Sequence, residues 1–201
     1  MLKRLLDFSA SLTGLMVVFP IMVVIGLWIR LDSKGPIFYR GTRVGKDGKE
    51  FHMLKLRTMV INADRLGGPS TSDDDPRLTK AGKQIRRYNL DELPQLINVL
   101  KGDMSIVGPR PEVPEEVEQY TEEEKALLSV RPGMTDYASI EFNNEGEILR
   151  GSKDPHQAYR EVIRPEKIRL GLEYVNTRSV YVDFKIIFKT LVILLRRSGL
   201  T

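Results

Sequence analysis

The residues best suited to chemistry lie in segment 89–96, which reads Asn-Leu-Asp-Glu-Leu-Pro-Gln-Leu. Pro94 has no amide hydrogen and is comfortable only in the first turn of a helix, where amide hydrogens lack internal partners. The spacing therefore predicts Asp91 and Glu92 at or just before a helix N-terminus. There the free amides and the helix dipole favour anions and keep a carboxylate ionised. Simple helix capping by Asn89 or Asp91 is the competing interpretation.

Cationic side chains that could neutralise a phosphate recur in peptides without an acidic neighbour. They are Lys55, Arg57, the pair Arg86 and Arg87, and Arg110. Prolines on both sides of Arg110 fix its backbone, which lowers the entropy lost when its guanidinium binds a phosphate. Each side chain taken alone could equally be an ordinary solvated residue. Their recurrence favours phosphate chemistry at the carboxylate pair.

Composition narrows the chemistry further. The chain has 201 residues, 31 Lys and Arg against 27 Asp and Glu, a net charge of +4 and 41% hydrophobic residues, which is typical of a globular protein. The absence of cysteine excludes disulfides, thiol nucleophiles and zinc–thiolate sites. The two histidines, His52 and His156, argue against a multi-histidine metal site. Carboxylates, Lys and Arg side chains, hydroxyls and backbone amides remain.

An uncharged stretch of 22 residues, 8–29, indicates a membrane segment. As a helix it would be about 33 Å long, enough to cross the hydrocarbon core of a bilayer. A buried core helix is the alternative, but a soluble domain seldom needs so long an uncharged stretch. We therefore predict a membrane anchor over residues 1–34 and a cytosolic domain over 35–201.

Two features favour an anchor that enters and leaves the membrane on one side. Pro20 near the middle removes a backbone hydrogen bond and usually kinks a helix. Basic residues flank both ends, Lys3 and Arg4 before the stretch and Arg30 after it, and such residues prefer the cytoplasmic face. These features predict a re-entrant helix-break-helix; a straight crossing helix stays the alternative.

The C-terminal segment 181–197 also reads as an amphipathic helix. Lys185, Lys189 and Arg196 fall within about 40° of each other on an otherwise apolar cylinder. Such a helix can lie in the membrane interface with its cations toward anionic headgroups. A core helix with a solvated edge explains the same pattern.

The remaining pattern predicts an α+β fold that is mostly helical. It comprises a small β-hairpin and amphipathic interfacial helices around a cytoplasmic active site. The Asp-Gly turn at 47–48 joins the two strands of the hairpin. The expected strands are 37–44, 50–56 and the short buried 104–107, and the expected helices are 78–88, 92–100, 157–163 and 165–176. Residues 112–124 hold seven glutamates and no basic residue, which predicts a solvated helix face without a role.

An ordered series of short motifs resembles a known family, the bacterial sugar transferases. More narrowly, the chain is similar to the small monotopic polyprenyl-phosphate phosphoglycosyl transferases. The motifs are KLRTM at 55–59, DPR at 75–77, LDELPQL at 90–96, KGDMS at 101–105, VGPRP at 107–111 and RPG at 131–133. The anchor with its central proline belongs to the same pattern.

The resemblance implies transfer of a sugar-1-phosphate from a UDP-sugar to undecaprenyl phosphate, with release of UMP. This would begin a surface glycan (exopolysaccharide, lipopolysaccharide O-antigen, capsule or glycoprotein) at the cytoplasmic face of the bacterial inner membrane. Asp91 would be the nucleophile that forms an aspartyl-phosphosugar, Glu92 a base or orienting group, and Mg²⁺ would lie at or near Asp91. The phosphate contacts would be Arg110, Arg86, Lys55, Arg57 and Arg131.

The chain departs from the family after the motif RPGMT at 131–135. Many relatives continue with a glycine and a Gln-Val-Asn-Gly-Arg-like stretch, whereas residues 136–145 here read DYASIEFNNE. We expect segment 136–160 to face the donor. The sequence leaves open the sugar, the glycan pathway and whether the chain forms a homo-oligomer.

Two rival functions remain at this stage. One is a catalytically silent membrane module that binds lipid headgroups through its basic surface. The other is a nucleic-acid binder, which is disfavoured because aromatic residues are only 7% and no recognition-helix motif is present. A silent module would not need the carboxylate of Asp91, which separates it from the enzyme.

Overall fold

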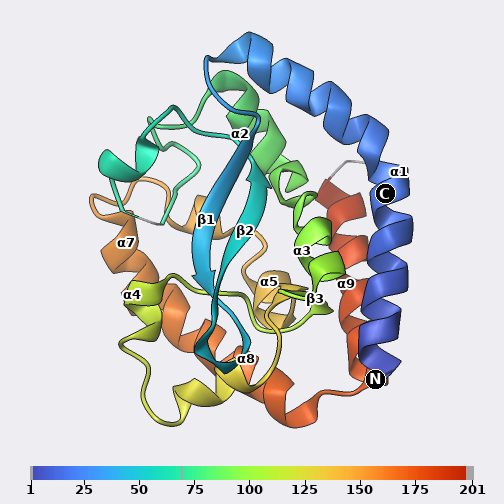
Figure 1. The fold of residues 1–201 in the computed structure, drawn as a ribbon. Helices are drawn as coiled ribbons and strands as arrows, with labels where there is room; N and C mark the ends of the chain where they lie inside the picture. The colour runs from blue at the N-terminus through green and yellow to red at the C-terminus, as the bar shows by residue number, and fades with distance from the viewer. Residues whose placement is uncertain (1, 69, 198–201) are drawn as a thin grey trace.

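The computed structural model describes residues 2–68 and 70–197, and it is mostly helical with two small sheets (Figure 1). The α+β prediction is confirmed. The helices are α1 Leu2–Asp32, α2 Lys80–Arg87, α3 Gln95–Lys101, α4 Pro114–Val117, α5 Tyr137–Glu141, α6 Glu145–Ile148, α7 Pro155–Ala158, α8 Arg164–Thr177 and α9 Val180–Arg197. The strands are β1 Phe38–Val44, β2 Glu50–Leu56, β3 Ser105–Val107 and β4 Gly133–Thr135. The 3₁₀ turns are Lys46–Gly48, Ala63–Arg65, Leu90–Glu92 and Glu124–Ser129, and Tyr159–Ile163 is a π-helical turn.

The hairpin forms where the sequence predicts it. β1 and β2 pair antiparallel from Phe38 opposite Leu56 to Val44 opposite Glu50. Residue Asp47 adopts the left-handed conformation at φ 58°, which an aspartate before a glycine tolerates. The hairpin carries Lys55 near the end of β2, at the opposite end from the turn.

The second sheet is a short parallel pair, β3 with β4. Gly108 directly follows β3, and Gly133 is the first residue of β4. The two glycines are in close contact. A Cβ on Gly133 would lie 2.1 Å from the amide nitrogen of Gly108. No side chain fits there, so both glycines are required for the approach that places the Pro109–Pro111 segment beside β4.

Helix α1 runs unbroken past Pro20, and Figure 1 shows it changing direction as it passes around the rest of the molecule. Within the described chain it is the one helix long and apolar enough to cross a membrane, with a mean hydropathy of 2.5 in its most apolar window. Most of its large apolar side chains are exposed, among them Met16, Phe19 and Val24. An exposed apolar surface of this kind suggests membrane association. Re-entry into one leaflet stays a prediction.

The N-terminal end of α1 is tied to the globular part by polar contacts. Lys3 pairs with Asp183 of α9 at 2.6 Å, and Arg4 donates to the carbonyl of Leu100 at 2.7 Å. Asp7 is buried, and its carboxylate accepts from the Ser105 hydroxyl at 2.9 Å. A buried carboxylate is costly without such partners, so these contacts fix the position of the helix against β3.

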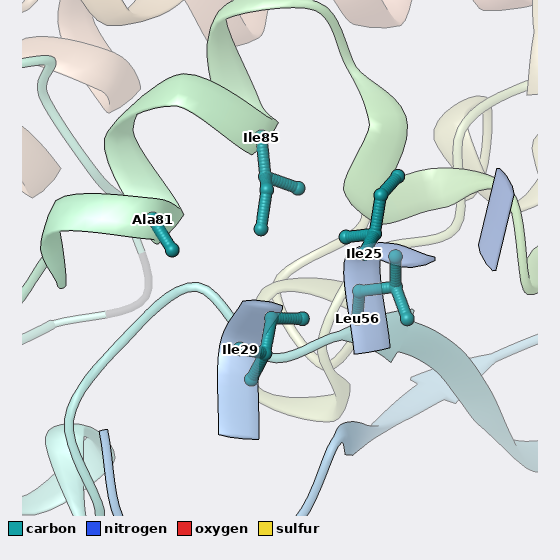
Figure 2. Close-up of a cluster of buried hydrophobic side chains, with 5 residues drawn as sticks. All are labelled: Ile25, Ile29, Leu56, Ala81 and Ile85. Carbon is teal, nitrogen blue, oxygen red and sulfur yellow. The ribbon is translucent and has the colours of Figure 1, made fainter. Parts of the chain in front are cut away.

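The C-terminal end of α1 is held by an apolar cluster and by one arginine. Ile25 and Ile29 pack against Leu56 of β2 and against Ala81 and Ile85 of α2 (Figure 2). All of these side chains are at most 5% exposed. Burial of each large side chain stabilises the folded state by about 1.5–3 kcal/mol.

The guanidinium of Arg57 reinforces the same end. It donates to the carbonyl oxygen of Ser33 at 3.0 Å, to its hydroxyl at 2.8 Å and to the carbonyl oxygen of Pro36 at 2.6 Å. Both ends of α1 are therefore attached to the same globular part.

Several local predictions are confirmed and one is wrong in part. The predicted helix 78–88 is α2, and the Thr79 hydroxyl caps it by accepting from the amide of Gly82 at 2.9 Å. The predicted strand 104–107 is β3, and the predicted helix 165–176 lies within α8. The prediction of a solvated glutamate face at 112–124 holds for the exposed Glu115, Glu118, Glu122 and Glu123 but is wrong for Glu116. Glu116 is buried and accepts from Arg160, because cations of the later helical segment fold over this run.

Helix α9 combines both alternatives predicted for segment 181–197. Ile186 is fully buried against Val107 and Tyr174, as in a core helix. Phe184 and Phe188 point outward and are 59% and 69% exposed. The outward surface thus has an apolar stripe beside the exposed Lys185, Lys189 and Arg196, and its location in a membrane interface stays a prediction.

Replacing Gly82 with alanine tests how α2 meets the hairpin. The added Cβ would lie 1.9 Å from the carbonyl oxygen of Thr58, so α2 would have to move away from β2. We expect a loss of about 3 kcal/mol in the free energy of unfolding, measured by denaturant titration in detergent. Gly14→Ala is the control, since its Cβ would meet only the Leu96 side chain at 3.4 Å. Equal stability of the two variants would contradict the close approach.

Candidate active site

Asp91 and Glu92 lie in the 3₁₀ turn Leu90–Glu92, directly before α3. The prediction that they sit at the start of a helix is confirmed, and Pro94 is the N-cap residue of α3. Neither Pro94 nor Asn89, the residue before the 3₁₀ turn, makes a side-chain capping hydrogen bond. Helix capping therefore does not account for the carboxylate pair.

Two cations from distant segments meet the carboxylates. Lys55 of β2 lies 2.9 Å from Glu92 Oε1 and 3.7 Å from Asp91 Oδ2. Arg110, three residues beyond β3, donates to both carboxylate oxygens of Glu92, with Nη1 at 3.3 Å from Oε2. Glu92 is thus bonded to both cations, whereas Asp91 has only the longer contact with Lys55 among the described ion pairs.

The two carboxylates differ in their electrostatics. Burial would raise the pKa of Glu92, but Arg110 and Lys55 outweigh it and hold that pKa well below its usual range. Burial raises the pKa of Asp91, and Lys55 offsets this only in part while the charge of Glu92 adds to it. The attraction of Glu92 raises the pKa of Arg110, which stays a cation. Glu92 is therefore a permanent anion, and Asp91 depends on further positive charge.

A single open cavity of about 1820 Å³ contains this cluster. Asp91, Glu92, Lys55 and Arg110 all line it, and so does Arg86 of α2. Arg86 is partly buried and forms no ion pair within the part of the chain that the structure describes. Its charge is therefore available to an anionic ligand in the cavity.

The structure brings three of the five predicted phosphate contacts together and leaves two elsewhere. Arg57 borders the cavity, but its guanidinium is engaged with Ser33, Pro36 and the carbonyl of Met59. Arg131 is exposed and donates to the carbonyl of Gly102, beyond the C-terminal end of α3. These two arginines have structural contacts that the sequence pattern did not reveal.

Arg43 of β1 is a cavity residue that the sequence did not single out. It lines the cavity, donates to the carbonyl of Thr42 at 2.8 Å and has no ion pair with a carboxylate in the described chain. Burial lowers its pKa, partly opposed by Glu112, while the nearby Arg110 lowers it further. Arg43 could have been found only from the hairpin register together with the position of Arg110, which the sequence does not give.

The divergent segment 136–160 packs on loop residues 70–75, and both segments form part of the cavity wall. The amide of Asp73 donates to the carbonyl of Gly146 at 3.0 Å, and Arg150 pairs with Asp73 at 3.2 Å. His156 Nδ1 lies 3.1 Å from the Ser70 hydroxyl. Side chains of both segments line the cavity. Contact of this wall with the donor stays a prediction.

A divalent cation fits this site only if a bound substrate and water supply further oxygen ligands. Among residues 2–68 and 70–197, no group of three or more His, Cys, Asp or Glu side chains could hold a metal ion. Both oxygens of Glu92 accept hydrogen bonds from Arg110. Of the two carboxylates in the cluster, Asp91 is therefore the one available to bind a metal ion. Mg²⁺ is commonly bound through one or two carboxylates together with substrate phosphates and water. Asp91 is compatible with that arrangement.

Comparison with known proteins places the chain among its relatives. A family model described as bacterial sugar transferase matches residues 1–197. The chain is 38% identical over 196 residues to the undecaprenyl-phosphate glucose phosphotransferase of Komagataeibacter xylinus, covering 94% of this chain and 35% of the relative. It is 37% identical over 193 residues to the UDP-glucose:undecaprenyl-phosphate glucose-1-phosphate transferase of Escherichia coli (strain K12), covering 94% and 39%.

A third relative is shorter. The chain is 47% identical over 122 residues to the putative undecaprenyl-phosphate N-acetylgalactosaminyl 1-phosphate transferase of Bacillus subtilis (strain 168), covering 61% of this chain and 68% of the relative. The chain thus spans less than half the length of the first two relatives.

Glu92→Gln tests the ion pairs of the cluster, because it removes the charge and keeps the size. We expect the free energy of unfolding to fall by about 2 kcal/mol at neutral pH. The folded pKa of Glu92 lies below the ordinary 4.5, so the wild-type advantage should be complete above about pH 5.5. It should shrink as the pH falls below 4.5 toward the folded pKa. The measurement is denaturant unfolding in detergent from about pH 7 to 3.

The exposed Glu118 provides the matched control. Glu118→Gln should differ little from wild type at neutral pH, since exposed charges contribute little. An advantage of wild type over Glu92→Gln that grows in acid would contradict the assignment of an ionised Glu92.

Proposed function

Because the chain belongs to the bacterial sugar transferase family, we propose that it is a phosphoglycosyl transferase. It transfers a sugar-1-phosphate from a UDP-sugar to undecaprenyl phosphate and releases UMP. The product would be the first lipid-linked intermediate of a surface glycan. The observation that carries the proposal is the buried Asp91, presented to the cavity beside the ion pairs of Glu92 with Lys55 and Arg110.

Asp91 is the nucleophile in this proposal. A carboxylate oxygen attacks the phosphorus that carries the sugar, the bond from that phosphorus to the bridging oxygen breaks, and UMP leaves with the electron pair. An oxygen of the lipid phosphate then attacks the same phosphorus. The bond to Asp91 breaks, the carboxylate is regenerated, and the lipid diphosphosugar departs.

Covalent capture solves an electrostatic difficulty. The donor diphosphate and the acceptor phosphate are both anions, so a direct meeting at close range is repulsive. With a covalent intermediate, UMP leaves before the lipid phosphate must approach. The cavity therefore needs to neutralise only one of these two substrates at a time.

Glu92 acts as a positioning residue in this scheme, not as a base. Both of its oxygens accept hydrogen bonds from Arg110, and Oε1 also accepts from Lys55. A carboxylate with its pKa held so low is a poor proton acceptor. Glu92 instead holds the two cations at the edge of Asp91, where they can bind phosphoryl oxygens.

Arg86 and Mg²⁺ complete the charge balance. Arg86 lines the cavity without a carboxylate ion pair in the described chain, so it can bind the donor phosphates. We propose that Asp91 holds Mg²⁺ together with substrate oxygens, and the ion when bound supplies charge neutralisation at phosphorus. This chain's own residues orient the phosphates through Arg86, Lys55 and Arg110.

The names of the relatives do not agree on one donor sugar. Their names specify glucose, galactose or N-acetylgalactosamine. The wall formed by segment 136–160 and residues 70–75 is our candidate for contact with the sugar and nucleoside. A panel of UDP-sugars with UMP release as the readout identifies the donor.

We further propose that α1 enters and leaves the cytoplasmic leaflet of the bacterial inner membrane. Lys3 and Arg4 at one end and Ser33 at the other all contact the globular part. Two ends attached to one body favour the same side of the membrane, and Pro20 lies where the path must bend. The arrangement keeps the cavity at the cytoplasmic face, where nucleotide sugars are found.

Asp91→Asn tests the nucleophile. Wild-type protein incubated with Mg²⁺ and a UDP-sugar that carries ³²P in the sugar-linked β-phosphate, without lipid, should retain label on the protein at residue 91, mapped by mass spectrometry. The variant should retain none and should lose overall activity by at least about 10³-fold, since the covalent route is removed. Removal of Mg²⁺ with EDTA should abolish labelling of wild type, and readdition should restore it.

Asp103→Asn serves as the matched control, since Asp103 lies in the following loop and is not a residue of the cavity wall as described. It should label like wild type. Turnover without label at residue 91 would contradict the covalent mechanism, and no UMP from any donor would contradict the transferase itself.

Paired cysteines test the topology, and the natural absence of cysteine gives a clean background. Leu2→Cys and Lys34→Cys should both react with a membrane-impermeant maleimide from the cytoplasmic side in inverted vesicles. Neither should react in intact spheroplasts. Labelling from opposite sides would establish a crossing helix and leave the enzymology untouched.

A further inference from the structure

We propose that the C-terminal half of α9 binds the isoprenoid chain of the acceptor lipid and thereby guides the lipid phosphate to Asp91. This inference rests on the proposed transferase function and names the surface that its lipid substrate would use. It assigns to α9 a role separate from membrane attachment, which α1 can provide.

The first observation is that the catalytic cavity has an apolar flank. One side of it is lined by the carboxylates and cations described above. Another part of the lining is apolar and comprises Ile187, Leu191, Ile193 and Leu194 of α9, with Ile106 and Met134 from the second sheet, and Ile106 and Ile187 pack in one cluster. The same cavity thus joins a phosphate-binding end to an apolar wall. No lining residue among those described belongs to α1.

The second observation is that this wall continues to the outer surface. Leu191 lines the cavity and is also 53% exposed. Its neighbours along the outer face, Phe188 and Leu195, are 69% and 45% exposed. An apolar chain can therefore pass from the outer face of α9 into the cavity without crossing a polar rim at this point.

The wall is held in place from behind. Ile186 is fully buried against Val107 and Tyr174. The Thr190 hydroxyl lies 2.7 Å from that of Thr135 on β4. α9 thus packs against β3, β4 and α5. A fixed wall in the cavity that also contains Asp91 sets the depth at which a bound chain presents its head group.

The chemistry of this surface fits one class of occupant. A phosphate attached to a long unsaturated hydrocarbon needs cations at one end and apolar contact along the rest. Arg86, Lys55 and Arg110 supply the first, and Ile187, Leu191 and Leu194 supply the second. A nucleotide sugar has no apolar surface of that length to cover. The flank is therefore assigned to the isoprenoid lipid phosphate.

The kinetic test compares cavity-lining and outward positions of the same helix. Leu191→Asn with Leu194→Asn should lower kcat/KM for undecaprenyl phosphate by about tenfold or more, because apolar contact is lost. In a ping-pong reaction, kcat/KM for the UDP-sugar reports only steps up to UMP release, so it should change less than about twofold. Phe184→Asn is the matched control, since Phe184 is exposed, lies in the N-terminal half of α9 and is not among the described lining residues.

A binding test does not depend on turnover. A photoreactive analogue of undecaprenyl phosphate should crosslink to residues 187–194 of wild-type protein in nanodiscs. Excess undecaprenyl phosphate should compete with it. The Leu191→Asn, Leu194→Asn protein should crosslink less at this segment, while its thermal unfolding midpoint shows whether it is folded.

The outcomes separate this inference from the proposed function. Wild type that produces no UMP and no lipid product overturns the transferase. Active wild type with equal acceptor kinetics in the Leu191→Asn, Leu194→Asn protein and the Phe184→Asn control overturns only the α9 surface. Competed crosslinks confined to α1 would likewise overturn it and place the chain along the anchor helix.

Discussion

The shared ion pair of Glu92 with Lys55 and Arg110 is the interaction on which the site depends. It joins the end of the hairpin, the segment after β3 and the turn before α3. Two cations and two carboxylates meet there, so the resting cluster is close to neutral. Burial of each charge is tolerable only because the others are present.

A neutral cluster explains why the cavity needs further cations. A bound diphosphate adds negative charge that Lys55 and Arg110 cannot balance while they also neutralise Glu92 and Asp91. Arg86 and Arg43 line the same cavity without carboxylate ion pairs in the described structure. Lys55 and Arg110 thus divide their charge between the carboxylates and a ligand, whereas Arg86 and Arg43 are left for a ligand alone. Burial raises the pKa of Asp91, and the surrounding cations offset this only in part.

Local signals in the sequence were enough to predict most of the elements that carry the site. The hairpin, α2 with its Thr79 cap, the helix start at Pro94 and β3 follow from turns, caps and proline rules that act within a few residues. Asp91 and Glu92 were located by the same rules. Their partners Lys55 and Arg110 were candidates, and the resemblance to the family made them stronger ones.

The long-range pairings could not be predicted in this way. Arg57 and Arg131 look like Arg86 in the sequence, yet their guanidinium groups are engaged by carbonyl oxygens at the end of α1 and at the end of α3. Glu116 reads as a surface residue and becomes buried because Arg160, 44 residues later, folds over it. Which cation meets which anion depends on tertiary contacts, and periodicity contains no such information.

The attachment of α1 also bears on how Asp91 could be reached both from water and from the membrane. Both ends of α1 are fixed to the globular part, so its exposed apolar face lies at a set distance from the cavity. In Figure 1, residues 70–75 and α7 lie on the other side of the hairpin from α1, whereas α5, at the start of segment 136–160, packs against α9. In the proposed reaction the water-soluble donor would therefore enter from the side of α7, and the lipid from the side of α9. The ion pairs of Glu92 hold the turn that carries Asp91 against both the hairpin and the segment after β3, so Asp91 faces the cavity that both substrates would share.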